Sequence, residues 1–489
     1  MIHYKERDPK DTVKILKEFF KDFKIKETSL TQINGNYWCH IELYSSDGKL
    51  LLAKANGKGI SPELTLASGY GELYERYCEN ITETEEDEPD ELDISFRYSG
   101  DEQVVTNNKN YAKEFVRNFE SGKIYTSNYA NLKDIFEVKE HAEVKHFSRK
   151  MITSLFGTTG LACGNSLSEA ILQALCELCE RSFIIDLLNT NKPFGKIIKV
   201  DKNENLGLTF EYYDFSFDCG LPVIGMRVYD SKNYAIGYSF GCHPVKEIAM
   251  ERCITEFTQG SILYGDKIHM PCSRLTSKNY KIEDYKGKGN VLKIFATGNG
   301  YIPFDKIANE EEICTQESGY FINIETNNNE ELLLFMLKLL KDYDIYVSNI
   351  SQCKGMYAVH LFSPRLETAE QLDFIPYGVD FDLYKLEMEF NGILKEAIKA
   401  RNITKVMDML KTAFIDYGVR IYSMFFPQAT MGFELEVFMA LMVSLYYKNK
   451  DLYITSQNDF QIMNQATDYI YSLSLDDQID FEKLLEYIN

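Results

Sequence analysis

Acidic and polar side chains recur at intervals of three and four residues in three segments of the sequence. They are Ser68, Glu72 and Glu75 in the first segment; Glu169, Gln173, Glu177 and Glu180 in the second; and Arg252, Glu256 and Gln259 in the third. Residues three or four apart share one face of an α-helix, so each set predicts a helix with an acidic or polar face. Clustered carboxylates need cations, and Mg²⁺ prefers oxygen ligands and often bridges phosphates. These spacings therefore indicate metal-assisted binding of a phosphorylated ligand.

A solvated helix face is the alternative interpretation of any one of these segments, because surface helices carry polar residues on one side. The second segment fits this alternative poorly, since positions 170–172, 174–176 and 178 are apolar and favour burial. Glu169 has a further alternative, because Ser166-Leu-Ser-Glu169 is a capping box that begins a helix. Three such segments in one chain make solvated faces a less favourable explanation of all of them.

The residues before each segment indicate how its helix begins. Residues 56–59, Asn-Gly-Lys-Gly, are predicted as a turn, and Ser61-Pro62-Glu63 then supplies an N-cap, a first-turn proline and a first-turn acid. The glycine-containing loop 157–165 leads into the second helix, where free backbone N–H groups suit an anion. Pro244 suits the first turn of the third helix. The sequence has no Walker motif and no protein-kinase glycine loop.

Taken in order, the three segments resemble the three signatures of the YcaO family. The signatures are Ser-x3-Glu-x2-Glu, Asn-x3-Glu-x7-Glu-x2-Glu-Arg and Arg-x3-Glu-x2-Gln, and this chain fills every position. The resemblance implies that magnesium ions are held by Glu72, Glu75, Glu169, Glu177, Glu180 and Glu256. It implies that ATP is contacted by Ser68, Asn165, Arg181, Arg252 and Gln259 and, by a weaker likeness near the N-terminus, by Lys5 and Thr12.

The resemblance also implies a reaction. YcaO enzymes use ATP to activate a peptide backbone amide, whose oxygen takes the γ-phosphoryl group; a side chain, a sulfide or an amine is added, and phosphate leaves. Phosphoryl transfer needs charge neutralisation and positioning, which glutamate-bound magnesium and the guanidinium groups of Arg181 and Arg252 would supply. The peptide or protein substrate, the incoming nucleophile and the catalytic base are not determined by the sequence.

The C-terminal part of the sequence favours one branch of the family. Azoline-forming members commonly end in a proline-rich tail, whereas the last proline here is Pro427. Residues 432–443 are instead similar to the standalone bacterial type, which is associated with methylthiolation of a small-subunit ribosomal protein. Three hypotheses stay open: an amide-activating enzyme that serves as an accessory factor for that methylthiolation, an azoline- or thioamide-forming subunit of a peptide natural-product pathway, and a nucleotide-gated interaction protein. A homodimer and a partner protein that delivers substrate or sulfur are further expectations.

Composition limits the other classes of function. The chain has 489 residues, of which 45% are hydrophobic and 26% charged, an ordinary globular balance. Its formal net charge of −21 and its lack of a basic cluster disfavour nucleic-acid binding. The charged start MIHYKERDPK has no apolar signal region, and the longest apolar run of the late segment, 437–443, is too short to span a membrane. We expect a cytoplasmic protein without nucleic-acid or membrane partners.

The cysteines and histidines do not indicate a zinc site, and the histidines show no metal-ligand spacing. The eleven cysteines are scattered, as is typical of reduced intracellular thiols. Cys176 and Cys179 form a CxxC inside the second predicted helix, and we expect them to pack as small apolar side chains, with a redox or metal role as the weaker alternative. His243 precedes Pro244 and is expected either to cap the third helix or to contact nucleotide.

The remaining pattern predicts the architecture. Strand-like runs occur at 36–43, 50–55, 221–229, 234–240, 344–350 and 357–362, and an amphipathic helix is predicted at 11–23. The acidic helices lie between strands, which is typical of an α+β fold with β-sheets and packed helices. Residues 82–92 read as a solvated acidic loop. Beyond 362 the pattern is helical, so we predict a catalytic domain over 1–376 and an all-helical C-terminal module over 377–489.

Overall fold

The computed structural model describes twelve segments and five single residues: 5–28, 30–33, 35–49, 51–81, 127–136, 143–147, 152, 156–189, 195–204, 207–229, 235–262, 319–322, 328–366, 393, 396, 400 and 405. The acidic loop predicted at 82–92 lies outside these residues. The helical module predicted at 377–489 also lies outside them, apart from four of the single positions.

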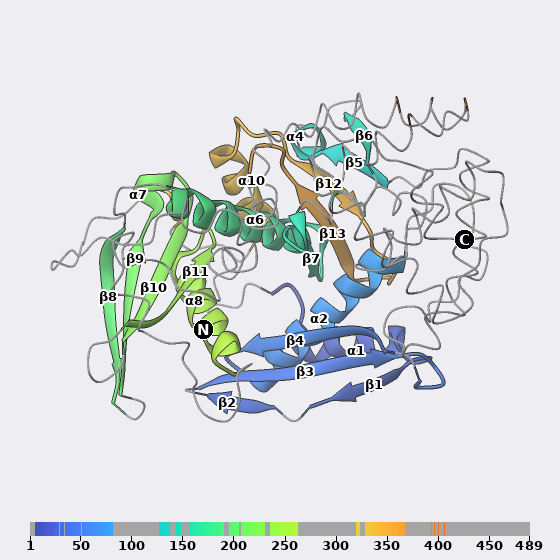
Figure 1. Ribbon diagram of the computed structural model, residues 1–489, viewed down its shortest axis with the longest axis horizontal. Helices are drawn as coiled ribbons and strands as arrows, with labels where there is room; N and C mark the ends of the chain where they lie inside the picture. Colours follow the sequence, from blue (N-terminus) through green and yellow to red (C-terminus); the bar gives the residue numbers. More distant parts are fainter. Residues whose placement is uncertain are drawn as a thin grey trace, which may run out of the picture.

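The N-terminal part of the chain forms an antiparallel sheet covered on one face by two helices (Figure 1). Its elements are α1 (Pro9–Phe19), β1 (Lys24–Glu27), β2 (Thr31–Ile33), β3 (Asn36–Tyr44), β4 (Leu51–Gly59) and α2 (Pro62–Ile81). β3 alternates buried and half-exposed side chains, and Cys39, Ile41 and Leu43 are fully buried in the core that includes Leu16 and Tyr74. The period of two is that of a strand with one face against helices.

A second antiparallel sheet follows in the order β11-β10-β9-β8. Its elements are β8 (Lys196–Asn203), β9 (Leu208–Asp214), the short helix α7 (Ser216–Cys219), β10 (Val223–Tyr229), β11 (Ala235–Cys242) and α8 (Lys246–Ile262). α8 packs on this sheet through Ala249 and Cys253, and the opposite face carries Phe215 and Phe240. Both faces of β10 are therefore covered, which explains its nearly continuous buried pattern.

The third sheet brings together strands from distant parts of the chain, in the order β6-β5-β12-β13-β7. Its strands are β5 (Ser127–Asn131), β6 (Val144–Phe147), β7 (Leu161–Gly164), β12 (Tyr346–Asn349) and β13 (Tyr357–Phe362), with helices α4 (Leu132–Phe136) and α10 (Asn329–Leu339) beside them. β7 pairs with β13 and leads directly into the second acidic helix, so this sheet fixes where that helix begins.

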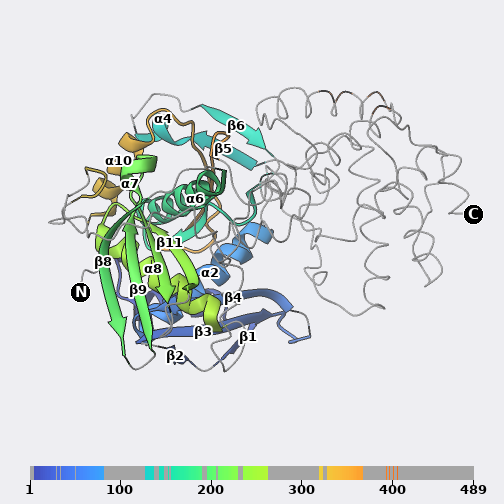
Figure 2. The ribbon, with the colours of Figure 1, turned by 60° about the vertical axis from the view of Figure 1, so that its left-hand side comes forward.

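Helix α6 (Leu167–Asn189) lies between the second and third sheets, as Figures 1 and 2 both show. It contacts β7, β13, β11 and α10, and most of its side chains are buried in the largest apolar cluster. Its N-terminus is capped as predicted, because the Ser166 hydroxyl accepts the Glu169 N–H at 3.1 Å. The apolar composition of this helix is thus explained by neighbours on several sides.

The predicted α+β class is confirmed, and each predicted strand overlaps an observed one whose ends differ by at most four residues. The turn predicted at 56–59 is wrong, because these residues are the end of β4. Gly57 is needed there for a close approach to α2: a Cβ on it would lie 2.1 Å from the Thr65 carbonyl oxygen. Strands β1, β2 and β5–β9 were not predicted from the sequence.

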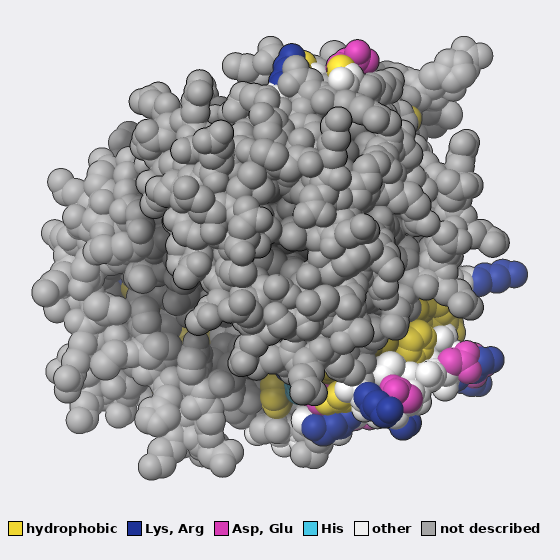
Figure 3. Space-filling view, turned by 45° about the vertical axis from the view of Figure 1, so that its right-hand side comes forward, with side chains coloured by type: hydrophobic (Ala, Val, Ile, Leu, Met, Phe, Trp, Pro, Cys, Tyr) yellow, Lys and Arg dark blue, Asp and Glu magenta, His cyan; other side chains and the backbone are white. Residues whose placement is uncertain are grey.

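Charges of both signs are interspersed on the described part of the surface in Figure 3. Ion pairs of this kind join Lys17 to Glu27 at 2.7 Å and Lys26 to Glu42 at 3.3 Å in the N-terminal unit. Exposed pairs contribute little to stability, so the fold depends on its apolar clusters. Among the described helices, none combines the length and apolar character needed to cross a bilayer.

Candidate functional site

A cavity of about 400 Å³ lies where α2, α6, α8, the end of β4 and the N-terminal segment 5–12 meet. Its lining includes eleven of the thirteen residues that the family resemblance assigns to ATP or magnesium: Lys5, Thr12, Ser68, Glu72, Glu75, Asn165, Glu169, Glu177, Arg181, Arg252 and Glu256. The other two differ in kind. Glu180 is not among the described residues that line the cavity, and the side chain of Gln259 lies outside what the structure describes.

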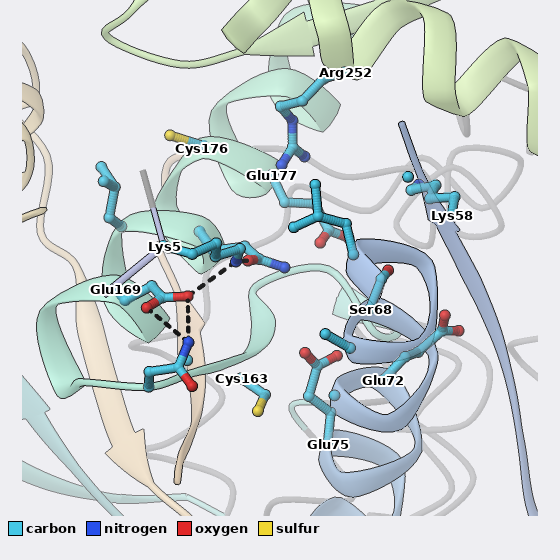
Figure 4. A pocket seen from close by; sticks show the side chains of 18 of the residues that line it. Lys5, Lys58, Ser68, Glu72, Glu75, Cys163, Glu169, Cys176, Glu177 and Arg252 are labelled. Atoms are coloured by element: carbon cyan, nitrogen blue, oxygen red, sulfur yellow. Dashed lines mark hydrogen bonds and ion pairs between the residues drawn. The ribbon is translucent and has the colours of Figure 1, made fainter. Parts of the chain in front are cut away.

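The α2 wall carries the first acidic set. Figure 4 shows Ser68 and Glu75 pointing from α2 toward α6, with Glu72 nearer to β4. Glu72 accepts the Asn56 N–H at 3.2 Å and forms an ion pair with Arg76 at 2.5 Å. Arg76 in turn donates to the Lys54 carbonyl at 2.7 Å. The Glu72–Arg76 pair therefore satisfies backbone groups on the outer edge of β4 and holds α2 against that strand.

The N-terminal segment is attached to the start of α6 at the opposite wall. Lys5 Nζ lies 2.9 Å from Glu169 Oε1, and the Thr12 hydroxyl donates to Asn165 Oδ1 at 2.7 Å. Arg7 also donates to Asn165, at 3.4 Å, and to the Gly355 carbonyl at 2.8 Å. Burial opposes ionisation of Glu169, but the positive charge and hydrogen bond of Lys5 outweigh it and lower the pKa of this carboxyl.

Glu75 and Glu177 lack comparable compensation. Burial raises the pKa of Glu75 well above its ordinary value, and the charges of Glu72 and Glu177 add to the effect. Burial also raises the pKa of Glu177, to about 7, although Arg181 and Arg252 oppose the shift. Their carboxylates face one cavity (Figure 4), so their ionisation is unfavourable until a cation enters. Shifts of this kind are typical of functional sites.

The α8 wall carries Arg252 and Glu256. Glu256 forms an ion pair with Lys58 on β4. Burial opposes its ionisation, yet Lys58, Arg181 and Arg252 lower its pKa to about 2. Arg252 pairs at 3.5 Å with Glu180, which also accepts the Cys242 N–H at 3.2 Å and is 2% exposed. Glu180 thus lies behind the wall and orients the guanidinium of Arg252.

The cavity wall carries equal numbers of acidic and basic side chains. Among the described residues, six carboxylates line it (Glu72, Glu75, Glu169, Glu177, Glu251, Glu256), together with six basic side chains (Lys5, Arg7, Lys58, Arg76, Arg181, Arg252). In the same part of the chain, no three His, Cys, Asp or Glu side chains are grouped closely enough to hold a metal ion between them. A Mg²⁺ ion here would therefore complete its shell with waters and oxygens of a bound ligand.

The lining residues that were not assigned to the site from the sequence include three basic ones, Arg7, Lys58 and Arg76. Arg76 had a usable signal, since it stands four residues after Glu72 on the same helix. Lys58 was hidden by the glycines on either side of it, which suggested a turn.

His243 was expected either to cap the third helix or to contact nucleotide. Its Nδ1 accepts the Val245 N–H at 3.0 Å, which caps the start of α8, and the residue also lines the cavity. Burial, with Arg252 and Lys5, lowers the pKa of His243 to about 3, so this imidazole is neutral.

The CxxC cysteines pack as expected. Cys176 and Cys179 are both fully buried in the apolar cluster around α6, and Cys176 also reaches the cavity wall. Burial raises the pKa of the Cys176 thiol well above its ordinary value, which keeps it protonated.

Comparison with known sequences gives one family. The model of the YcaO cyclodehydratase family, described as ATP- and Mg²⁺-binding, matches residues 56–367. An uncharacterised protein of Haemophilus influenzae is 22% identical over 390 residues, 73% of this chain and 64% of that protein. The ribosomal protein S12 methylthiotransferase accessory factor YcaO of Escherichia coli K12 is 23% identical over 383 residues, 70% of this chain and 61% of that protein. The aligned part is thus less than two thirds of the length of these relatives.

Two solved structures show a more distant likeness. A heterocyclase in complex with substrate and cofactor matches at a TM-score of 0.48 with 15% identity, over 74% of this chain and 53% of that one. YcaO from Methanopyrus kandleri bound with AMPPCP and Mg²⁺ matches at a TM-score of 0.44 with 14% identity, over 73% and 91%. Because the family model spans well over half of the chain and covers every acidic set that lines the cavity, the chain belongs to the YcaO family of ATP- and Mg²⁺-binding proteins.

Proposed function

We propose that this protein is an ATP- and Mg²⁺-dependent enzyme that activates a backbone amide of a peptide or protein by O-phosphorylation. The observation that carries the proposal is the convergence of three helices with acidic and polar faces, together with Lys5 and Thr12, on a single cavity. A solvated helix face does not explain this arrangement, because Glu169 and Glu180 are almost fully buried.

The residues present fit a metal–nucleotide pair. Glu75 and Glu177 are buried carboxylates with raised pKa values, which a divalent cation would stabilise in the ionised form. Arg252 offers the complementary feature, since its Nε is buried and has no hydrogen-bond acceptor among the described residues. A phosphate oxygen is the acceptor that a guanidinium binds best. Carboxylates on α2 and α6 would hold magnesium, and Arg181 and Arg252 would bind the triphosphate.

When bound, ATP and magnesium supply the phosphoryl group and the Lewis acidity that the reaction needs. The chain's own residues hold these groups in place. Lys5, Thr12 and Asn165 form one side of the cavity and fix the N-terminal segment across it. Arg252 is oriented by Glu180 before any ligand binds, so little rearrangement is needed when negative charge develops.

The finer role has three candidates. One is an accessory factor for methylthiolation of a small-subunit ribosomal protein, supported by the Escherichia coli relative at 23% identity. The second is an azoline- or thioamide-forming subunit of a peptide natural-product pathway, supported by the cyclodehydratase description of the family. The third is a nucleotide-gated interaction protein. We place the protein in the cytoplasm, as a homodimer, with a partner that delivers substrate or sulfur.

Calorimetric titration with AMPPCP, an ATP analogue that is not hydrolysed, tests the site. We expect Mg²⁺ to tighten binding strongly, and Glu177→Gln to weaken the Mg²⁺-dependent binding by about 10-fold or more. Glu204→Gln, an exposed change in the turn after β8, is the matched control. Equal affinity with and without Mg²⁺ would remove the metal–nucleotide interpretation.

Mass spectrometry with ATP and a protein substrate tests the reaction. Ribosomal protein S12 and a set of Cys-, Ser- and Thr-containing peptides are the probes, with ADP and phosphate measured in parallel. Loss of one water per amide identifies azoline formation, and replacement of oxygen by sulfur in the presence of sulfide identifies a thioamide. ATP-dependent capture of a protein with no change in any amide mass supports the nucleotide-gated role instead.

A further inference from the structure

We propose that Lys58 is an exchangeable counter-ion: it neutralises Glu256 while no divalent cation is bound and turns to the phosphates of the nucleotide when Mg²⁺ takes its place. The inference rests on the proposed function, because it concerns how that site changes from the empty to the loaded state. It assigns a role in ligand binding to a strand residue outside the three acidic sets.

The pair joins two walls of the cavity. Lys58 belongs to β4 and Glu256 to α8, 198 residues later, and both side chains are part-buried, at 28% and 22% exposure. Both residues line the cavity, and Figure 4 shows Lys58 reaching in from the strand opposite Arg252. The ammonium group of Lys58 therefore lies against Glu256, a residue predicted from the sequence to bind metal, at the wall of the cavity.

The carboxylate of this pair has fewer hydrogen-bond and ion-pair partners than the carboxylates of the other ion pairs of the site. The carboxylate of Glu169 binds Lys5 but also accepts from Asn165 and from the Glu6 N–H. Glu72 and Glu180 likewise each accept a backbone N–H besides their arginine. For Glu256, Lys58 is the sole hydrogen-bonding or ion-pair partner in the part of the chain that the structure describes. Opening this pair therefore breaks the fewest contacts.

The backbone beneath Lys58 is fixed while its side chain can move. Gly57 and Gly59 pack directly against the start of α2, where added Cβ atoms would lie 2.1 Å from the Thr65 carbonyl and 3.0 Å from its nitrogen. A lysine side chain is a flexible four-carbon stem with a compact charge. The ammonium group can consequently change partners without movement of β4 or α2.

Electrostatics couples the exchange to both ligands. A divalent cation at Glu256 repels the ammonium of Lys58, and the released ammonium gains a partner only when phosphate oxygens are present. The metal alone must therefore displace Lys58 without compensation and binds weakly. Nucleotide restores the balance, so that metal and nucleotide favour each other's binding.

Replacing Lys58 with Met tests the exchange, with Lys54→Met as the matched control on the exposed face of the same strand. Binding of Mn²⁺, an oxygen-preferring stand-in for Mg²⁺, is measured by electron paramagnetic resonance without nucleotide, and binding of Mg²⁺–AMPPCP by calorimetry. We expect Lys58→Met to bind Mn²⁺ alone about 5-fold or more tighter and Mg²⁺–AMPPCP about 10-fold weaker than the parent. Lys54→Met should match the parent in both measurements.

Fluorescence of a native tryptophan can report movement of the Lys58 side chain. Trp38 is the sole tryptophan of the sequence and is the register partner of Lys58 on β3. Addition of Mg²⁺–AMPPCP should shift Trp38 emission in the parent and in Lys54→Met, and the shift should be lost in Lys58→Met. If Lys58→Met does not fold, Lys58→Arg serves instead: its bidentate grip on Glu256 should weaken Mn²⁺ binding.

The outcomes separate the inference from the proposed function. If the parent binds no Mg²⁺–AMPPCP, the proposed function fails and the inference with it. If the parent binds but Lys58→Met behaves like the control, Lys58 is not an exchanging counter-ion. If Lys58→Met weakens both metal and nucleotide binding, Lys58 is a structural link between β4 and α8, and the inference is overturned while the proposed function stands.

Discussion

The side-chain amide of Asn165 donates to both carboxylate oxygens of Glu169, at 3.2 and 3.1 Å, across the start of α6. Its oxygen accepts the Thr12 hydroxyl at 2.7 Å, so the amide is oriented by a donor from the N-terminal segment. One asparagine therefore connects a residue of α1 to a predicted metal ligand on α6. An aspartate of the same size would accept from Thr12 but could not donate to Glu169.

We expect Asn165→Asp to weaken AMPPCP binding in the presence of Mg²⁺ by about 10-fold or more and to lower stability by about 1–3 kcal/mol. The cause is a second carboxylate beside the buried Glu169, with two donor hydrogens lost. Calorimetry and urea unfolding measure the two effects. Asn128→Asp, exposed on β5, is the control. Parent-like values in both measurements would show that the Asn165–Glu169 contact is unimportant.

Which side chains share a helix face was predictable from the sequence, because this depends on spacing within helices. Ser68, Glu72 and Glu75 share a face by the helical repeat alone, whatever they pack against. That three such faces meet was not predictable from spacing, since it requires β7 to pair with β13 and place α6 opposite α2. Lys58 was missed because the glycines beside it suggested a turn, and because its ion-pair partner Glu256 on α8 lies far away in the sequence.

The strands were predicted less completely than the helix faces. Strands with apolar alternation, such as β3, were recognisable, whereas β8 carries Lys199, Asp201 and Lys202 on an edge of its sheet and gives little apolar signal. Glycine misled the prediction at residues 56–59 because it has two uses. Local rules associate it with turns, but here it permits a helix to approach a strand, which only the tertiary structure reveals.

Glu177→Gln should stabilise the protein without ligands, and more so at high pH. The pKa of Glu177 is raised from 4.5 to about 7, so the folded protein keeps a proton that the unfolded chain releases. Its contribution to stability is therefore greatest at low pH and is lost as the pH rises through about 7. We expect the melting temperature of the variant to match the parent near about pH 5 and to exceed it by roughly 2–4 °C above about pH 8.

Differential scanning fluorimetry across this pH range measures the effect, with Glu331→Gln on the exposed side of α10 as the control. A difference between Glu177→Gln and the parent that does not change with pH would contradict the raised pKa. The same substitution weakens ligand binding under the proposed function. A gain in stability together with a loss of binding would show that the carboxylate is kept for its function.

Glu180 allows a metal ligand to be distinguished from a residue that positions Arg252. Glu180→Gln keeps an acceptor for the Cys242 N–H, whereas Glu180→Ala leaves both that N–H and the buried Arg252 without it. We expect the Ala variant to lose about 3 kcal/mol or more of stability and the Gln variant clearly less. Chemical denaturation measures both.

Ligand titrations of the Gln variant then separate the two roles. If Glu180 positions Arg252, nucleotide affinity falls while the Mg²⁺ concentration needed for half-maximal binding stays the same. If Glu180 holds metal directly, as the family resemblance implies, the Mg²⁺ requirement rises. Equal stability losses in the Ala and Gln variants would show that the Cys242 N–H contact contributes nothing.

Two glycines near the cavity should respond in opposite ways to the same added methyl group. In Gly57→Ala the Cβ would lie 2.1 Å from the Thr65 carbonyl oxygen and 2.7 Å from Cys39 Sγ, so β4 and α2 must separate. In Gly71→Ala, within α2, the nearest atom is Cys163 Sγ at an ordinary 3.8 Å.

Alanine favours a helix over glycine by about 1 kcal/mol, so Gly71→Ala should be neutral or stabilising. Gly57→Ala should cost about 2 kcal/mol or more by overpacking. Urea unfolding of both variants compares them directly, and similar stabilities would mean that the strand and helix are not held at this close approach.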